Sequence, residues 1–139
     1  MMRRVVVTGM GIVSPIGNST QEVLASLREA KSGITFSDQF AEMGFRSQVW
    51  GKPEIDLDGL VDRKARRFMG DGVAYNYVAL QQAIADAGLE DSDVSNEKTG
   101  IIMGSGGPST KNLIEAADKA RNSGPKRVGP FMVPRTMSS

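Results

Sequence analysis

Two short apolar runs, each followed by glycines and then by a helical pattern, indicate which class of fold the chain adopts. The first run is Val5–Val7 and the second lies within Thr99–Gly104. Runs of this kind are typical of strands buried on both faces of a sheet. The order of strands and helices predicts an α/β fold, with the two strands paired in parallel through a right-handed crossover. Between them, Ser47–Gly51 predicts one further short strand.

Three stretches have the spacing and boundaries of helices. Ser19–Glu22 forms a capping box, in which the serine hydroxyl and the glutamate carboxylate each accept a hydrogen bond from a free backbone N–H. The second helix ends at Gly88, and the third begins after Ser109 or Thr110. The residues expected on the buried faces are Val73, Tyr77, Leu80, Ile84 and Ala87 in the second helix, and Leu113, Ile114 and Ala117 in the third.

Composition indicates an ordinary packed domain. The chain has 139 residues, of which 40% are hydrophobic and 24% charged, and no Gly/Ser-rich linker divides it. We therefore expect one unit, residues 1–139, without an internal boundary. Lys and Arg total 17 against 16 Asp and Glu, so the net charge of +1 favours neither nucleic acid nor a membrane as partner. The apolar run after the first residues is too short for a signal peptide, which predicts a cytoplasmic location.

The chain contains no cysteine and no histidine. A disulfide framework, a thiolate metal site, a cysteine nucleophile and an imidazole base are therefore all excluded. Neither Ser105 nor Ser109, the serines of the glycine-rich turn before the third helix, is followed three residues later by a lysine that could activate it. We expect no catalytic residue, no metal ligand set and no cofactor site in this chain.

Two glycine clusters invite a ligand-binding interpretation. Gly9 and Gly11 follow a predicted strand, but the third glycine of a G-x-G-x-x-G motif would fall on Ser14. The cluster Gly104–Gly107 lacks the Lys-Ser/Thr ending of a P-loop. A nucleotide-binding α/β domain is therefore a remote alternative, and glycines that permit a positive φ or a close backbone approach are the favoured interpretation.

Basic residues gather at Arg63–Arg67, and Lys126 and Arg127 follow further along the chain. Such a run could dock an acidic partner through charge-assisted hydrogen bonds. The alternative is a solvated helix face, which is the commoner role of exposed charges. The residues by themselves favour the solvated face.

Several motifs together resemble the β-ketoacyl-[acyl-carrier-protein] synthases of fatty acid synthesis, and the bacterial type I synthase more than type II. The resemblance spans almost the whole chain but only the leading part of the family's length. It implies a thiolase-like, layered α/β/α/β/α fold, of which this chain is an incomplete amino-terminal part. The motifs are Arg4–Gly17, Lys31–Ile34, Ser47–Gly51, Asp62–Met69, Gly104–Gly107 and Gly129–Pro134.

The family's reaction, as the resemblance implies, transfers an acyl group to a cysteine. Decarboxylation of malonyl carrier protein and Claisen condensation then follow, assisted by two histidines. All three residues are expected beyond Ser139, so the fragment is expected to be inactive by itself. An alternative is a non-catalytic carrier-protein-binding or self-associating module. The resemblance also implies that the full-length acyltransferase is a homodimer.

The resemblance also implies accessory sites. Lys64, Arg67 and Lys126 match basic positions that dock the acidic acyl carrier protein, and Arg127 is their neighbour. Gly107 matches a glycine beside the acyl tunnel. Met137 matches a residue that reaches the tunnel of the partner subunit.

Overall fold

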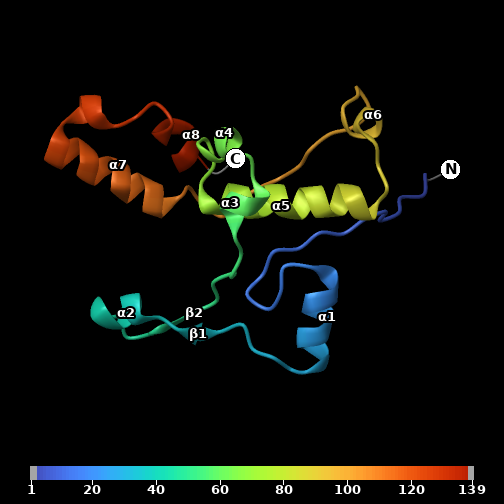
Figure 1. Cartoon of the computed structure of the whole chain (residues 1–139), viewed down its shortest axis with the longest axis horizontal. Coiled ribbons are helices and arrows are strands. Elements are labelled where there is room, and N and C mark those ends of the chain that lie inside the picture. Colours follow the sequence, from blue (N-terminus) through green and yellow to red (C-terminus); the bar gives the residue numbers. More distant parts are fainter. Residues whose placement is uncertain (1–2, 138–139) are drawn as a thin grey trace. The chain divides into compact units, whose positions relative to one another are not determined.

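The computed structural model describes residues 3–137 (Figure 1). They divide into two compact units, the first made of residues 3–55 and 79–90 and the second of residues 56–78 and 91–137. The helices and strands, in chain order, are α1 (Thr20–Arg28), β1 (Thr35–Phe36), α2 (Asp38–Glu42), β2 (Val49–Trp50), α3 (Leu57–Leu60), α4 (Arg63–Arg66), α5 (Asp71–Asp86), α6 (Asp91–Val94), α7 (Thr110–Ser123), the 3-10 helix η1 (Pro125–Arg127) and α8 (Met132–Thr136).

In the first unit, α1 begins as the capping box predicts. The Ser19 hydroxyl accepts a hydrogen bond from the Glu22 N–H at 3.2 Å, which satisfies one of the free amides of the first turn. The Glu22 carboxylate accepts from the Asn18 N–H at 2.7 Å, one residue before the position that a standard capping box uses. The start of this helix is therefore specified locally by its own first residues.

The strands β1 and β2 form a two-stranded antiparallel sheet, with Thr35 opposite Trp50 and Phe36 opposite Val49. The helix α2 lies between them in the sequence, and its Phe40 ring contacts Trp50 edge-on with a centroid distance of 5.5 Å. An aromatic contact of this kind helps to hold a hairpin that two residue pairs alone would stabilise weakly. The strand predicted around residues 47–51 is confirmed.

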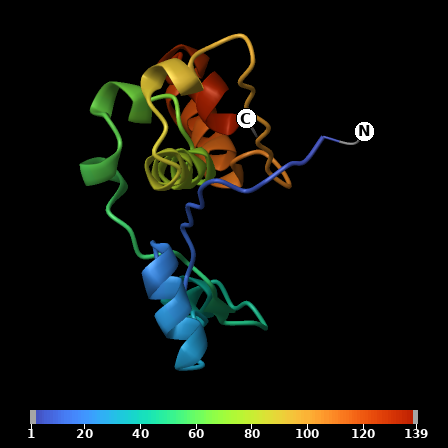
Figure 2. The same ribbon diagram turned by 90° about the vertical axis from the view of Figure 1, so that its right-hand side faces the viewer.

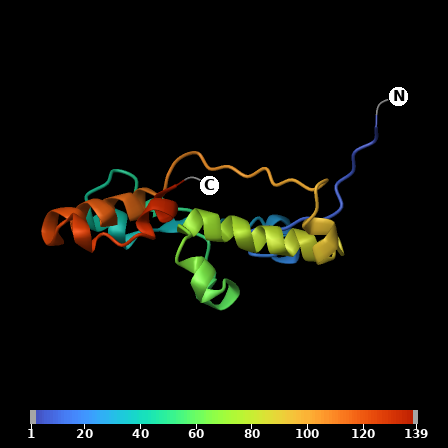
Figure 3. The ribbon, with the colours of Figure 1, turned by 90° about the horizontal axis from the view of Figure 1, so that it is seen from above.

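The parallel pairing predicted for the two apolar runs is wrong. Val5–Val7 and Ile101–Met103 are extended single chains rather than strands (Figures 2 and 3), and the exposed fraction reaches 93% at Val5 and 101% at Ile102. A strand of the buried kind needs hydrogen-bonding neighbours and a covering layer on each face. Residues 3–137 contain only the β1–β2 pair, so neither run has such neighbours.

The second half of α5 supports the chain that follows the first apolar run. The Met10 N–H donates to an Asp86 carboxylate oxygen, and the Ile12 N–H donates to the Gln82 side-chain carbonyl, each at 2.9 Å. Gly11 lies so close to the backbone of α5 that a Cβ there would collide with the Ala79 carbonyl oxygen. Close backbone approach, rather than a positive φ, is therefore what the glycines of this segment provide.

The helix α5 also ends as predicted. Gly88 has a φ of +65°, and the Leu89 N–H donates to the Ile84 carbonyl at 3.2 Å while the Gly88 N–H donates to the Ala85 carbonyl at 3.1 Å. These two bonds make a Schellman motif, which satisfies carbonyls that the helix itself leaves free.

Within residues 3–137, no helix is long and apolar enough to cross a membrane.

In the second unit, α7 contacts both η1 and α8, and Figures 1 and 3 show α8 beside α7. The helix α7 begins after Ser109 and ends at Gly124, as the sequence predicts. The predicted buried face is wrong, because Leu113 and Ile114 are 51% and 61% exposed while Asn112 is buried. The polar Asn112 faces inward because its amide makes hydrogen bonds there, which an apolar periodicity rule does not consider.

Candidate functional site

A carboxylate at the start of α5 joins two basic residues of the second unit. Asp71 accepts a hydrogen bond from an Arg66 Nη at 2.6 Å and another from Lys111 Nζ at 3.2 Å. Partial burial by itself would raise the pKa of Asp71, but these hydrogen bonds and the two positive charges outweigh it and hold the pKa below its ordinary value. The second Arg66 Nη donates to the Met69 carbonyl at 2.6 Å. The guanidinium of Arg66 is therefore fixed in place.

Beside this carboxylate is a cleft of about 300 Å³, here called the Gly107 cleft. Gly107 and Met137, the two residues that the family resemblance matches to an acyl tunnel, both line it. A Cβ at Gly107 would meet no atom within 4 Å, so the absent side chain leaves open space. The full lining is Gly70, Asp71, Gly72, Val73, Asn76, Ser105, Gly107, Pro108, Ser109, Thr110, Lys111 and Met137.

Asn112 holds the wall of the Gly107 cleft together. It is 3% exposed, and its Nδ2 donates to the Ser109 hydroxyl at 2.7 Å and to the Arg135 carbonyl at 3.4 Å. The Ser109 N–H donates to the Thr136 carbonyl at 3.3 Å, which adds a second tie between the start of α7 and α8. Sequence reasoning missed Asn112. The apolar periodicity of this helix gave no signal for it, because the predicted buried positions are Leu113, Ile114 and Ala117.

The predicted carrier-protein residues are all exposed and belong to two elements of the second unit. Lys64 is in α4 and Arg67 directly follows it, while Lys126 and Arg127 are in η1. Asp62 caps α4 by accepting hydrogen bonds from the first amides of the helix, including that of Lys64 at 2.9 Å. No described contact brings the two pairs together.

A second cleft of the same unit, of about 610 Å³, is lined by Arg63, Arg66, Arg67 and Arg135, with Asp58 and Val61. We call it the arginine cleft. Neither Lys126 nor Arg127 lines it. The contribution of Arg135 was not predicted, because it lies far from the basic run in sequence and only the fold brings it there.

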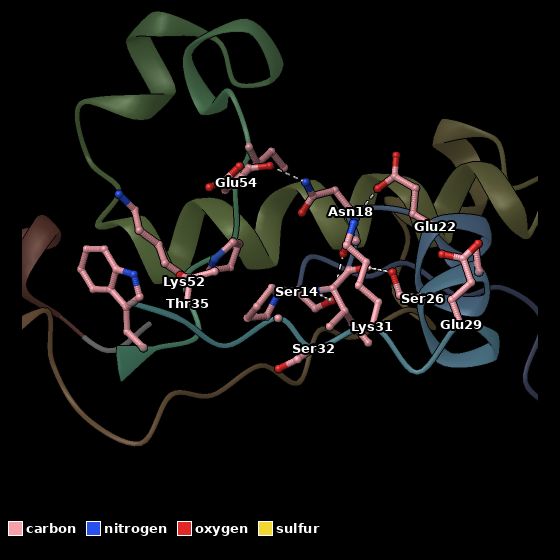
Figure 4. Close-up of a pocket in the computed structure, with 18 residues that line it drawn as sticks. Ser14, Asn18, Glu22, Ser26, Glu29, Lys31, Ser32, Thr35, Lys52 and Glu54 are labelled. Atoms are coloured by element: carbon pink, nitrogen blue, oxygen red, sulfur yellow. Dashed lines mark hydrogen bonds between the residues drawn. The ribbon is translucent and has the colours of Figure 1, made fainter. Parts of the chain in front are cut away.

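In the first unit, a cleft of about 750 Å³ lies between the chain around Ser14–Asn18, α1 and the chain after β2. Figure 4 shows Asn18 at its wall, where Nδ2 donates to the Glu54 carbonyl at 2.6 Å and the N–H donates to Glu22. A Cβ at Gly33 would come within 2.7 Å of the Pro15 side chain. Two of the motifs that carry the family resemblance therefore pack directly on each other.

The chemistry of this larger cleft is mixed. Its charged lining residues are Glu22, Glu29, Lys31, Lys52 and Glu54. Among residues 3–137, no group of three or more His, Cys, Asp or Glu side chains could hold a metal ion. The chain also has no cysteine or histidine to act as nucleophile or base. The lining of this cleft therefore contains neither a thiol nor an imidazole.

The nucleotide-binding alternative does not fit the structure. A phosphate cradle needs free backbone N–H groups, whereas the Met10 and Ile12 amides already donate to α5. The acceptor for Met10 is the Asp86 carboxylate, whose negative charge would repel a phosphate. The glycines around these residues therefore serve packing against the helix.

Solved structures define the class of protein. The ishigamide ketosynthase/chain length factor superposes with a TM-score of 0.83 at 26% identity, covering 97% of this chain and 34% of that chain. A β-ketoacyl synthase from Burkholderia phymatum superposes with a TM-score of 0.80 at 28% identity, covering 99% and 34%. The α/β, thiolase-like ketosynthase fold, present here as an incomplete part, is thereby confirmed.

Sequence relatives identify the family. The model of the β-ketoacyl synthase amino-terminal domain matches residues 2–139, so the chain belongs to the β-ketoacyl synthase family. It is 51% identical to 3-oxoacyl-[acyl-carrier-protein] synthase 1 of Escherichia coli, over 99% of this chain and 34% of that protein. Identity to synthase 2 of Vibrio harveyi is 36%. The resemblance to the type I synthase is confirmed, and the chain spans about a third of the length of these relatives.

Proposed function

We propose that this chain is the amino-terminal part of a condensing enzyme of fatty acid synthesis, a cytoplasmic acyltransferase. The whole enzyme elongates an acyl chain by decarboxylative Claisen condensation with malonyl-acyl carrier protein. The observation that carries the proposal is the 51% identity, over nearly the whole chain, to a protein named 3-oxoacyl-[acyl-carrier-protein] synthase 1. The name of this relative also supports the acyl carrier protein as the partner.

The chain contributes scaffold and binding surface to that reaction rather than reactive groups. Thioester formation needs a nucleophile such as a thiolate, and the chain has no cysteine. Proton transfer and enolate stabilisation need positioned donors, and the chain has no histidine. Its exposed Lys64, Arg67, Lys126 and Arg127 suit an acidic carrier protein.

Binding of carrier protein without condensation is the expected behaviour of the chain. Replacing Lys64 and Arg67 together with glutamate should weaken binding of acyl carrier protein about tenfold at low salt, and the difference should shrink as salt is added. Calorimetry measures the affinity, and mass spectrometry of a mixture with acyl- and malonyl-carrier protein should show no condensed product above background.

The matched control reverses two other exposed charges, Lys119 and Arg121 of α7, which should leave the affinity unchanged. Condensed product from the chain alone would refute its inactivity. If the Lys64/Arg67 variant binds carrier protein as tightly as the unmodified chain, these two residues belong to an ordinary solvated helix face and not to a docking surface. Binding without condensation would also fit the alternative of a non-catalytic module. Condensation by a longer protein that contains this chain would exclude that alternative.

The Gly107 cleft is proposed as part of the acyl tunnel, completed across a homodimer. Gly107 and Met137 share this cleft, and the exposed apolar side chains of Val5–Val7 and Ile101–Met103 offer surface for self-association. A fluorescent fatty acid should co-sediment with a species of twice the chain mass. Replacing Gly107 with tryptophan should fill the open space and abolish co-sedimentation, while Gly129→Trp, also in open space but outside the cleft, should not. If both variants still co-sediment with the fatty acid, the tunnel assignment is contradicted.

A further inference from the structure

The arginine cleft gathers guanidinium groups from two separate parts of the second unit. Arg63, Arg66 and Arg67 come from α4 and its end, and Arg135 comes from α8. The only carboxylate among the six lining residues is Asp58. Four positive charges that line one cleft repel one another, and an anion bound between them relieves this repulsion. The cleft therefore has the composition of an anion site.

Two of these arginines have buried donors without an acceptor. The Nε–H groups of Arg66 and Arg135 are inaccessible to solvent and have no hydrogen-bond partner in the described part of the chain. A buried donor without a partner costs free energy, and a charged one costs more than a neutral one. Both side chains line the arginine cleft, so an oxyanion placed there lies beside two guanidinium groups whose hydrogen bonding is incomplete.

Arg66 is also held rigidly for this purpose. One N–H of each Nη donates, to the Met69 carbonyl and to Asp71, while its Nε–H has no acceptor among the described residues. A guanidinium held in one orientation loses little side-chain entropy when it binds an oxyanion. Arg63, Arg67 and Arg135 form no ion pair with any carboxylate of residues 3–137. They therefore remain available to the same ligand.

We propose that the arginine cleft binds a phosphate group carried by a small molecule. Asp58 is the one carboxylate among the lining residues, and Asp71, which pairs with Arg66, is shared with Lys111, so at least two of the four arginine charges are unbalanced. A phosphate monoester carries a charge of about −1.5 to −2 at pH 7, whereas a single carboxylate carries only one. The planar guanidinium matches the geometry of phosphate oxygens. The volume of about 610 Å³ exceeds what a phosphate alone needs and falls within the range of small-molecule sites.

Phosphate binding here does not depend on carrier-protein docking. Arg67 belongs to both surfaces, but Arg66 and Arg135, which hold the buried donors, do not belong to the proposed docking residues. A test without any carrier protein therefore separates the two proposals. If phosphate does not bind, this result says nothing about the affinity for carrier protein, which is measured separately.

The test is an NMR titration of the 139-residue chain that follows the arginine Nε–H resonances. Glycerol 3-phosphate and inorganic phosphate are added at millimolar concentrations and constant ionic strength, with acetate and chloride as comparison anions. The Nε–H resonances of Arg66 and Arg135 should shift in a saturable way with either phosphate. The resonance of Arg121, an exposed arginine of α7 outside the cleft, should stay constant. Tighter binding of glycerol 3-phosphate than of inorganic phosphate would identify an organic monoester as the ligand, and the reverse would identify free phosphate.

Variants make the test specific to the cleft. Arg135→Gln should weaken phosphate binding at least about tenfold, because a charged hydrogen-bond donor is lost. Arg121→Gln should leave the affinity unchanged. If Arg135→Gln does not fold, Arg63→Gln replaces it, since Arg63 is exposed and has no described side-chain partner. No saturable shift, an equal response to acetate, or equal losses in the Arg135 and Arg121 variants would each overturn the proposal.

Discussion

Replacing Gly11 with alanine is expected to destabilise the first unit by about 2–4 kcal/mol. The new Cβ would collide with the Ala79 carbonyl oxygen and come within 2.8 Å of the Ala83 nitrogen. Both atoms belong to the backbone of α5 and cannot rotate away as a side chain end could. The segment must therefore leave the helix, and the hydrogen bond from the Ile12 N–H to Gln82 breaks with it.

Urea unfolding followed by circular dichroism measures this loss, and hydrogen exchange of the Ile12 amide locates it. The matched control is Gly104→Ala, because a Cβ at Gly104 would meet no atom within 4 Å and its φ is not positive. The control should change the free energy of unfolding by less than about 0.5 kcal/mol. Equal stability of the two variants would mean that the close approach of Gly11 to α5 does not exist in solution.

Replacing Asn112 with leucine is expected to destabilise the second unit by about 2 kcal/mol. The leucine has a similar volume, but it leaves the Ser109 hydroxyl and the Arg135 carbonyl without their donor. Because one amide joins the start of α7 to α8, its loss should also loosen the wall of the Gly107 cleft. The Oδ1 atom of Asn112 has no hydrogen-bond partner among the described residues, so the leucine variant loses only the hydrogen bonds that Nδ2 donates.

The same unfolding measurement applies, together with hydrogen exchange of the Ser109 amide, which donates to the Thr136 carbonyl. Asn122→Leu is the control, since it makes the same change at an exposed position of the same helix. Faster exchange at Ser109 in the Asn112 variant alone is the expected pattern. A variant as stable as the control would show that the amide bonds of Asn112 contribute nothing net.

Local features of the sequence predicted the start of α1, the end of α5 and the start of α7 correctly, whereas the shorter helices were not predicted. Ser19 starts α1 and Gly88 ends α5 because each acts on backbone groups within a few residues of itself. The same reasoning anticipated the close backbone approach at Gly11, although not the partner that makes it. The family motifs were recognisable for a similar reason, since they are fixed orders of residues.

The tertiary structure decided the features that depend on distant partners. Val5–Val7 has the sequence of a buried strand, yet pairing requires neighbouring strands, and the described residues supply none to it. Asn112 faces inward because α8 offers it an acceptor. Arg135 joins Arg66 in one cleft although nearly seventy positions separate them. The sequence alone determined the family, the ends of α1, α5 and α7 that carry capping residues, and the absence of thiol and imidazole chemistry, since these depend on residue identity and short-range geometry. Burial, strand pairing and the gathering of charges were decided only by long-range packing, because each requires atoms that the local sequence does not contain.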